Sequence, residues 1–214
     1  MAEQQKTSAA PWVPSTKNLG KLRQAASGCR GCSLYEHATQ VVFGEGPQHA
    51  KVVMVGETPG NDEDLVGHPF VGPAGKLLNK AMDEAGIDRT KVYVTNAVKH
   101  FKFTERGKRR IHGKPSGTEI SACRPWLEAE LAAIRPELIV CLGATAAQTL
   151  MGRDFRITRE RGVFFPHRWA KQLVATIHPS AILRAQDRLE EEYGLFVRDL
   201  QAVAARIREL ELAS

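Results

Sequence analysis

Three polar side chains of different chemistry follow apolar segments of the chain. Glu57 and Asn96 stand at the ends of two such segments, and His178 stands at the end of another. A carboxylate, an amide and an imidazole at one edge of a fold would supply an anion, a paired donor and acceptor, and a proton donor. Glu57 and Asn96 could each merely cap a helix or a turn, because Asn and Gly-Pro segments favour turns. The coincidence of all three favours an active site.

The four cysteines are a second set of groups suited to chemistry. Cys29 and Cys32 form a CxxC pair, and Cys123 and Cys141 follow with 17 residues between them. In an intracellular chain such thiols bind a metal or a cluster more often than they form disulfides. One site with four thiolates would use every cysteine, although a strand residue such as Cys141 can also be plain apolar filling. Zinc and an iron–sulfur cluster both suit thiolates, and the spacing does not choose between them.

A basic stretch is the third set. Eight basic residues lie within 16 positions: Lys99, His100, Lys102, Arg106, Lys108, Arg109, Arg110 and Lys114. Such cations contact the phosphates of nucleic acid without reading its sequence, and binding should then weaken steeply with salt. A solvated basic loop is the alternative. The formal net charge of +6 also favours an anionic partner, either nucleic acid or an anionic membrane surface.

The elements that would position these groups can be read from apolar patterns. Four segments are typical of buried strands: residues 51–57, 91–98, 137–143 and 172–178. Helical patterns occupy residues 75–85, 118–134, 144–151 and 189–212. Strands that alternate with helices predict an α/β fold with a central four-stranded parallel sheet, flanked by helices on both faces. In such sheets ligands bind beyond the carboxyl ends of the strands, where Glu57, Asn96 and His178 would meet.

The 214 residues suit one compact domain. Residues 1–16 contain Pro11, Pro14 and scattered Ser and Ala, which predict a flexible tail, so the domain spans residues 17–214. No apolar run approaches the roughly 20 residues of a membrane helix, and the first residues lack the apolar stretch of a secretory signal. We therefore expect a cytoplasmic protein with no membrane attachment.

One apparent nucleotide-binding motif is excluded. Residues 72–76 read GPAGK, which suggests a phosphate-binding loop. The full pattern G-x-x-x-x-G-K-[ST] would need Gly in place of Phe70 and Ser or Thr in place of Leu77, so the motif fails at both positions.

Four motifs together carry a resemblance to a known family. They are GETPG at residues 56–60, GHPFVGPAGKLL at 67–78, YVTNAVK at 93–99 and HPSAILR at 178–184. They resemble the uracil-DNA glycosylase superfamily, and the cysteine arrangement looks like that of its family 4, whose members carry a [4Fe–4S] cluster. The resemblance implies a three-layer α/β/α fold, uracil-containing DNA as the substrate, and a cluster on Cys29, Cys32, Cys123 and Cys141.

The resemblance also implies roles for single residues. Phe70 would stack on the extruded base, Asn96 would pair with its polar edge, and His178 would donate to a uracil oxygen as the base leaves as an anion. Phe70 could instead be core packing, and His178 a turn residue before a helix. Three residues of the first motif would also contact uracil: Gly56, Thr58 and Gly60. The implied phosphate ligands are Lys99, Lys102, Lys108, Arg109, Arg110, Lys114, Ser180 and Arg184.

One segment departs from ordinary family 4 enzymes. The loop at residues 102–114 is extended and basic, and its run KRRIH, which ends at His112, is similar to a loop of the X-type uracil-DNA glycosylases (UdgX). In that group the loop histidine is implied to bond covalently to the abasic sugar. A second departure is Thr58, because the X-type motif usually has Gln there. Thr is shorter, so a role of the Gln amide does not carry over.

The resemblance implies that His112 acts as a nucleophile in place of water. A neutral imidazole is competent near neutral pH, because its reference pKa is about 6.5. Glu57 on the other ring nitrogen would fix the tautomer and disperse the developing charge. Uracil must be flipped out of a duplex or be met in a single strand. These inferences predict a single-turnover glycosylase with His112, Glu57 and His178 as catalytic residues, for which a monomer suffices.

Two alternatives remain open. The first is an ordinary multiple-turnover family 4 glycosylase, in which the basic loop only grips DNA. The second belongs to another class: a zinc-containing nucleic-acid-binding module without catalytic activity. A covalent adduct, repeated release of uracil, or zinc without released uracil would distinguish the three.

Overall fold

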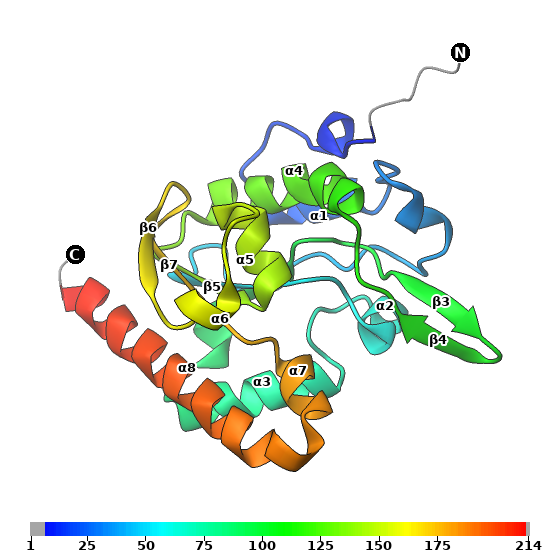
Figure 1. Ribbon diagram of the computed structural model, residues 1–214. Coiled ribbons are helices and arrows are strands. Elements are labelled where there is room, and N and C mark those ends of the chain that lie inside the picture. The colour runs from blue at the N-terminus through cyan, green and yellow to red at the C-terminus, as the bar shows by residue number, and fades with distance from the viewer. Residues whose placement is uncertain (1–6, 213–214) are drawn as a thin grey trace.

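A five-stranded sheet runs through the middle of the molecule in the order β2-β1-β5-β7-β6 (Figure 1). The computed structural model describes residues 7–212. The strands are β1 (Val52–Gly56), β2 (Val92–Asn96), β5 (Leu138–Leu142), β6 (Phe164–His167) and β7 (Ala170–Thr176). β2, β1, β5 and β7 are parallel, so the predicted four-stranded parallel sheet is confirmed. The fifth strand, β6, was not predicted. It pairs antiparallel at the edge, where a strand tolerates Pro166.

Helices cover both faces of the sheet, which is why β1, β2 and β5 are buried along their whole length. Trp126, Leu127 and Leu22 pack on one face, and Leu78, Met82 and Phe196 pack on the other. Figure 1 shows these two layers above and below the sheet. The first layer contains α1 (Leu19–Ala26), α4 (Gly117–Ile134) and α5 (Ala144–Met151). The second contains α3 (Pro73–Glu84), α7 (Pro179–Arg184) and α8 (Leu189–Leu212).

The predicted helices start and end close to where the structure places them, because their end signals are local. Ser116 and Glu119 cap the start of α4 reciprocally, each side chain accepting the other's backbone N–H. Gly86, just past α3, has a φ of 74°, a conformation that favours glycine at a helix end. Helices α1 and α7 were not predicted. The remaining helical segments were not predicted either, and most span a turn or two: η1 (Ala10–Trp12), η2 (Ser33–Glu36), α2 (Asn61–Val66), η3 (Arg89–Lys91), α6 (Ile157–Glu160) and η4 (Gln186–Arg188).

The predicted flexible tail does not hold for residues 7–16. The Ala9 N–H donates to the Ala122 carbonyl of α4 at 2.7 Å, and Ala9 is buried. Trp12 and Val13 pack against the core beside it. Composition suggested a tail because the segment is rich in Pro, Ser and Ala. The segment is ordered instead because Trp12 and Val13 pack against the core. Residues 1–6 of the predicted tail lie outside the described part of the chain.

The basic loop after β2 is a β-hairpin. β3 (Phe103–Arg106) and β4 (Arg109–His112) pair antiparallel, and Gly107 begins the two-residue turn with a φ of 61°. The hairpin projects from the body beside α2, as the green arrows of Figure 1 show. Its charged residues hide the alternation of a strand, which is why the sequence indicated only a loop. None of the helices formed by residues 7–212 has the length and apolar character that crossing a membrane requires.

Candidate active site

A pocket of about 520 Å³ opens at the carboxyl ends of β1, β5 and β7. Glu57 enters it from the loop after β1, Thr145 from the start of α5, and His178 from the end of β7. His112 lines it from the last residue of β4, at the base of the hairpin, although its position in the chain lies far from the other three. The three residues expected to be catalytic therefore line one cavity, which has the size of an ordinary small-ligand site.

Glu57 is held in the pocket by a residue that sequence reasoning missed. The Thr145 hydroxyl donates a short hydrogen bond to Glu57 Oε2. The expected hydrogen bond between Glu57 and His112 is not formed among the described residues. The carboxylate still acts on the imidazole through its charge, because it opposes the fall in the pKa of His112. Glu57 is thus placed as a fixed negative charge facing the space where a substrate would react.

His112 has a lowered pKa although part of its ring remains exposed to solvent. The surrounding protein removes hydration from the charged form, and this lowers the pKa more than the neighbouring Glu57 raises it. His112 pairs with Phe103 across the hairpin, and its ring centre lies 5.9 Å from that of Phe101. The imidazole is therefore neutral at neutral pH, with a lone pair available at the pocket.

His178 caps the start of α7 and has a defined tautomer. Its Nδ1 accepts the Ser180 backbone N–H at 3.1 Å, and the Ser180 hydroxyl lies 2.8 Å from the same atom. The proton of the neutral ring must then lie on Nε2. Burial lowers the pKa of His178 to about 4, helped by the nearby Arg184. His178 is therefore a neutral N–H donor, which fits the expected role of stabilising a leaving anion.

Phe70 and Asn96 meet behind β1, deeper than the open pocket. A Cβ on Gly56 would lie 2.7 Å from Phe70 Cζ and would collide with the Asn96 amide oxygen, so only glycine fits between the strand and these side chains. The Phe70 ring stacks on the His178 ring with centres 6.3 Å apart. Gly56, Phe70, Asn96 and His178 thus gather as expected for a base-binding site.

The backbone of Phe70 is unusual for a residue with a large side chain. Its φ is 57°, in the left-handed region that non-glycine residues rarely adopt. Its carbonyl lies where a side chain on Gly75 would be, so Gly75 leaves the room for this conformation. Strain of this kind persists only when the surroundings hold it, and it often marks a functional site.

Thr58 and Gly60 serve the structure of the loop as well as the pocket. Thr58 lines the pocket, and its hydroxyl donates to the His100 carbonyl at 2.9 Å. The Gly60 N–H donates to Glu63 Oε2 at 3.0 Å, and the other oxygen of Glu63 accepts the Gly72 N–H. Gly60 therefore cannot offer that N–H to a base. Glu63, which sequence reasoning missed, joins the two loops around the site.

The structure brings together Cys29, Cys32 and Cys123 but leaves Cys141 apart. The first three line one small cavity, whose lining also includes His100. Burial raises the pKa of Cys123 to about 12, and its neighbours Cys32 and Cys29 add to the rise. Burial alone raises the pKa of Cys141, with no part played by another cysteine. Cys141 is fully buried inside β5, so its expected ligand role is corrected to apolar filling.

The cavity offers partners for a buried inorganic group. The Lys99 N–H donates to Cys123 Sγ at 3.2 Å, which is the contact that stabilises a thiolate ligand. Trp126 also lines the cavity, and its indole N–H is buried without a hydrogen-bond partner. In the described part of the chain no three His, Cys, Asp or Glu side chains are close enough to hold one metal ion. The residues surround a space, which fits a cluster whose metal atoms bind separate ligands.

Lys99 is not a phosphate ligand, because its side chain is 1% exposed. Its Nζ lies 2.5 Å from Glu130 Oε2, whose side chain is fully buried. Nζ also donates to the Asn96 carbonyl at 2.7 Å and to the Thr95 hydroxyl. The expectation failed because a lysine beside other basic residues is usually solvated, whereas this one finds a buried carboxylate. It positions the backbone of Asn96.

Two further basic residues are engaged within the protein. Lys102 Nζ lies 2.8 Å from Glu119 Oε2, at the start of α4. Arg110 Nη1 lies 2.6 Å from Asp64 Oδ2, a carboxylate of α2 with no exposed surface. Asp64 and Glu119 were not singled out from the sequence, since acidic residues in the first turn of a helix are common. Arg110 is thereby tied to the body of the protein instead of being free for DNA.

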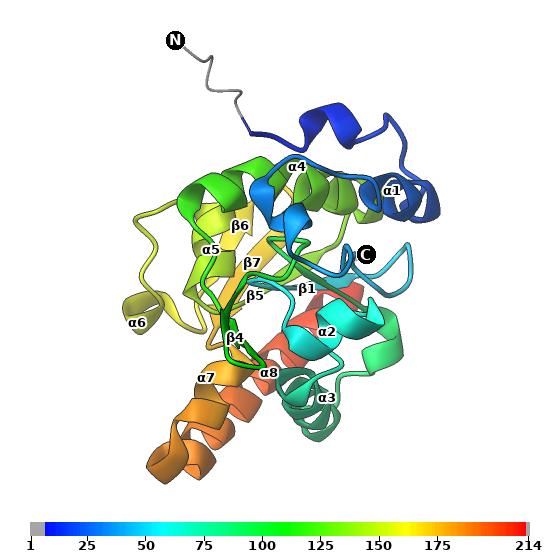
Figure 2. The same ribbon diagram turned by 90° about the vertical axis from the view of Figure 1, so that its right-hand side faces the viewer.

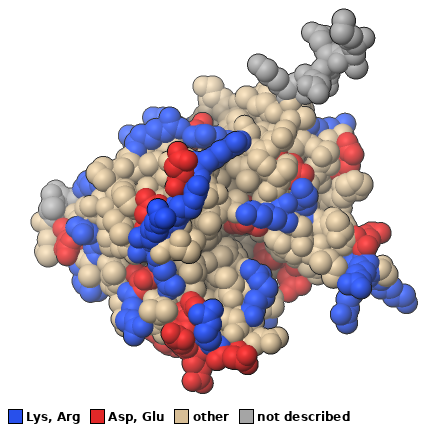
Figure 3. All heavy atoms as spheres, in the orientation of Figure 1, with Lys and Arg blue, Asp and Glu red and all other residues tan. Residues whose placement is uncertain are grey.

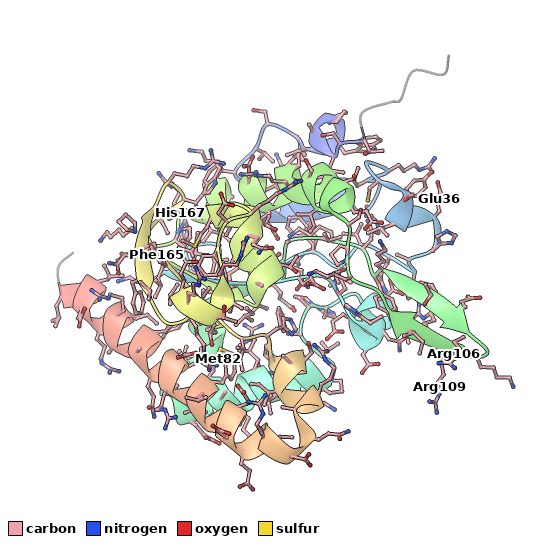
Figure 4. The ribbon with its side chains drawn as sticks, in the orientation of Figure 1. Glu36, Met82, Arg106, Arg109, Phe165 and His167 are labelled. Atoms are coloured by element: carbon pink, nitrogen blue, oxygen red, sulfur yellow. The ribbon has the colours of Figure 1, made fainter. Side chains whose placement is uncertain are left out.

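The other expected phosphate ligands lie at the surface around the pocket. Lys114, Ser180 and Arg184 line its mouth. Lys108 and Arg109 are exposed at the turn of the hairpin, and Figure 4 shows Arg109 pointing away from the body at its tip. Lys and Arg side chains also gather across the middle of the face shown in Figure 3. This distribution agrees with contacts to a polyanion near the pocket.

Comparisons with known proteins agree with this geometry. Residues 43–201 match the family model described as the uracil DNA glycosylase superfamily. The chain is 40% identical over 184 residues to the type-4 uracil-DNA glycosylase of Archaeoglobus fulgidus, covering 83% of this chain and 88% of the relative. It is 37% identical over 182 residues to the type-4 uracil-DNA glycosylase of Thermotoga maritima, covering 85% and 90%. Similarity to the type-5 uracil-DNA glycosylase of Thermus thermophilus is lower, at 28%.

Breaking the buried Lys99–Glu130 ion pair should lower the free energy of unfolding far more than breaking the partly exposed Lys102–Glu119 pair. Lys99→Met leaves the Glu130 carboxylate buried without its cation, which should cost about 3–5 kcal/mol of unfolding free energy. Lys102→Met removes a partly exposed pair and should cost about 0–1 kcal/mol. Denaturant unfolding measures both. Equal costs for the two variants would contradict a structural role for Lys99.

The stability of the protein should depend on pH through His178. Because its pKa falls from 6.5 to about 4 on folding, the unfolded chain binds the proton first as the pH decreases. The unfolding free energy should therefore fall from pH 6.5 to about 4, by about 3 kcal/mol from this group. His178→Gln should flatten that part of the profile. An unchanged pH profile in the variant would show that the ring is not buried as a neutral group.

Proposed function

The chain belongs to the uracil-DNA glycosylase superfamily, and we propose that it excises uracil from DNA and then becomes bonded to the deoxyribose through His112. The observation that carries the proposal is the place of His112. It lines the same pocket as Glu57 and His178, and it is the last residue of β4, at the base of the hairpin. A nucleophilic ring thus occupies the approach that a hydrolytic water would use.

Excision breaks the bond between the base and the sugar, and opposite charges develop on the two parts. The electron pair of the C1′–N1 bond moves to uracil, which leaves as an anion, and the sugar becomes electron-poor at C1′. His178 can donate its Nε2 proton in a hydrogen bond to the uracil oxygen on which that charge develops. Phe70 can stack on the base and Asn96 can pair with its edge, both held against Gly56. Glu57 supplies negative charge near the sugar.

Capture of the sugar follows from the state of His112. Its lowered pKa leaves a lone pair on one ring nitrogen, which forms a bond to C1′. The proton on the other ring nitrogen passes to solvent or to the uracil anion, so the imidazole of the product is neutral. This product has no good leaving group, and the pocket stays occupied. The reaction therefore stops after one turnover.

The substrate we propose is uracil in a single strand or flipped from a duplex. Lys114 and Arg184 at the mouth of the pocket and Lys108 and Arg109 on the hairpin would meet phosphates on either side of the extruded nucleotide. One copy of the chain contains every group used in this scheme, so we propose that it acts as a monomer.

A [4Fe–4S] cluster is the cofactor that we propose for the cysteine cavity. Cys29, Cys32, Cys123 and His100 would be its ligands, with Trp126 beside it. The cluster would bind the N-terminal segment to α4 and to the end of β2, close to Lys99 and Asn96. Its role in this proposal is structural, because the cavity lies behind the strand ends and not in the pocket.

An ordinary turnover glycosylase is the second candidate, favoured by the identity to type-4 uracil-DNA glycosylases. In that case water attacks C1′ and the hairpin only grips DNA. The two candidates share the excision step and differ in the atom that captures the sugar.

The adduct is the decisive test. Wild-type protein mixed with a uracil-containing single-stranded oligonucleotide should give a protein–DNA band that survives denaturing electrophoresis, and a thymine oligonucleotide should give none. His112→Ala should remove the band and Glu57→Gln should slow its appearance by about 10²- to 10³-fold, as expected for a lost electrostatic contact to the transition state. Arg106→Ala on the same hairpin is the control and should keep the band. Repeated uracil release by the wild type without a band would select the turnover enzyme.

The ligands of the cluster can be tested separately from activity. Purified protein should contain iron and acid-labile sulfide in equal amounts. Cys123→Ala should lose them, whereas Cys141→Ala should keep them. His100→Cys should keep the cluster with a lower reduction potential, since replacing His by thiolate lowers the potential of such centres. Zinc in place of iron, or loss of the cluster in Cys141→Ala alone, would refute this assignment.

A further inference from the structure

One side chain of the hairpin is fixed to the body of the protein by an ion pair to a buried carboxylate. Arg110 Nη1 lies 2.6 Å from Asp64 Oδ2, and the Asp64 side chain has no exposed surface. The same carboxylate accepts hydrogen bonds from the backbone N–H and the hydroxyl of Thr39. Three segments that are distant in the chain, namely the loop before β1, α2 and the hairpin, therefore meet at one carboxylate.

The guanidinium of Arg110 is held on its edge and on its face. Its Nε donates to the Asn61 side-chain oxygen at 2.9 Å, beside the bond to Asp64. Its plane lies over the rings of Phe101 and Phe103, at 5.3 Å and 5.0 Å from their centres. A planar fork with these contacts fixes an orientation that the flexible ammonium of a lysine would not.

His112 follows Arg110 by two positions on β4, so the two side chains leave the same face of the strand. Phe103, which lies under the guanidinium, is also the residue paired with His112. The view in Figure 2 places the hairpin against α2, in front of the carboxyl ends of the strands. Any tilt of the hairpin away from α2 would therefore move the imidazole out of the pocket.

We propose that the Arg110–Asp64 pair is a latch that keeps His112 in the pocket and so decides between covalent capture and hydrolysis. The inference rests on the proposed function. After the C1′–N1 bond breaks, the electron-poor C1′ accepts a lone pair either from His112 or from water. With the latch closed the imidazole occupies the approach. With the latch open water enters, an O–H bond breaks as the C1′–O bond forms, and the protein is released for another turnover.

The test counts the two outcomes of one excision step. Uracil released and protein trapped in denaturation-resistant adduct are measured in the same reaction on a uracil-containing oligonucleotide. Wild type should release one uracil for each adduct. Arg110→Met should release about 10- to 100-fold more uracil per adduct, because a displacement of the nucleophile by an ångström has an effect of that size. Arg110→Lys should lie between the two, since it keeps the charge and lacks the fork.

Arg109→Met is the matched control. It removes the same charge from the adjacent position, whose side chain is exposed at the hairpin tip (Figure 4). It should weaken DNA binding, as the loss of any surface cation does, and leave the ratio of uracil to adduct at the wild-type value. If Arg110 served as a phosphate ligand, both variants would change the salt dependence of binding alike and neither would change the ratio.

A double variant distinguishes loss of the latch from misfolding caused by an unpaired buried charge. Arg110→Met alone leaves the Asp64 carboxylate buried without its cation, whereas Asp64→Asn together with Arg110→Gln removes both charges. A raised ratio of released uracil to adduct in this double variant, with a thermal unfolding temperature like that of wild type, would support the latch. A wild-type ratio in the double variant and in Arg110→Met would overturn it. Failure of wild type to form any adduct would instead refute the proposed function, so the two results are distinguishable.

Discussion

A buried ion pair between Lys99 and Glu130 joins the two functional regions of this protein. The ammonium lies 2.5 Å from the carboxylate and also donates to the Asn96 carbonyl, beside the proposed base-binding residues. The backbone N–H of the same lysine donates to Cys123 Sγ at the cysteine cavity. Because neither charge can be left unpaired in a low-dielectric interior, the segment after β2 has one conformation. The place of Asn96 and the shape of the cysteine cavity both depend on it.

The candidate active site contains two neutral histidines in different environments. His178 is kept neutral because the surrounding protein removes hydration from its charged form, and its Nδ1 is occupied, so it can only donate from Nε2. His112 is kept neutral by partial loss of hydration at the mouth of the pocket, and Glu57 acts on it only through charge. One imidazole therefore suits the leaving base and the other suits the sugar. Their environments, and not their residue type, separate the two roles.

The hairpin adds an element that the sheet does not position. The strand ends of β1, β2 and β7 bring Glu57, Asn96 and His178 together, as in any parallel sheet of this kind. His112 instead depends on side chains that join the hairpin to α2. In the proposed reaction, the strand ends would support the excision step, while the separately anchored hairpin would supply the group that captures the sugar.

The sequence by itself determined the parallel strands, the helices α3, α4, α5 and α8, and the polar residues at the strand ends, because apolar periodicity and helix caps are local signals. Only the tertiary structure decided which side chains meet. Asp64 lies 46 positions from Arg110, and Glu130 lies 31 positions from Lys99, so no local pattern pairs them. Local spacing also does not show that His100 lines the same cavity as three of the cysteines, whereas Cys141 does not line it. The direction of a side chain depends on packing between distant segments, and that information is absent from spacing alone.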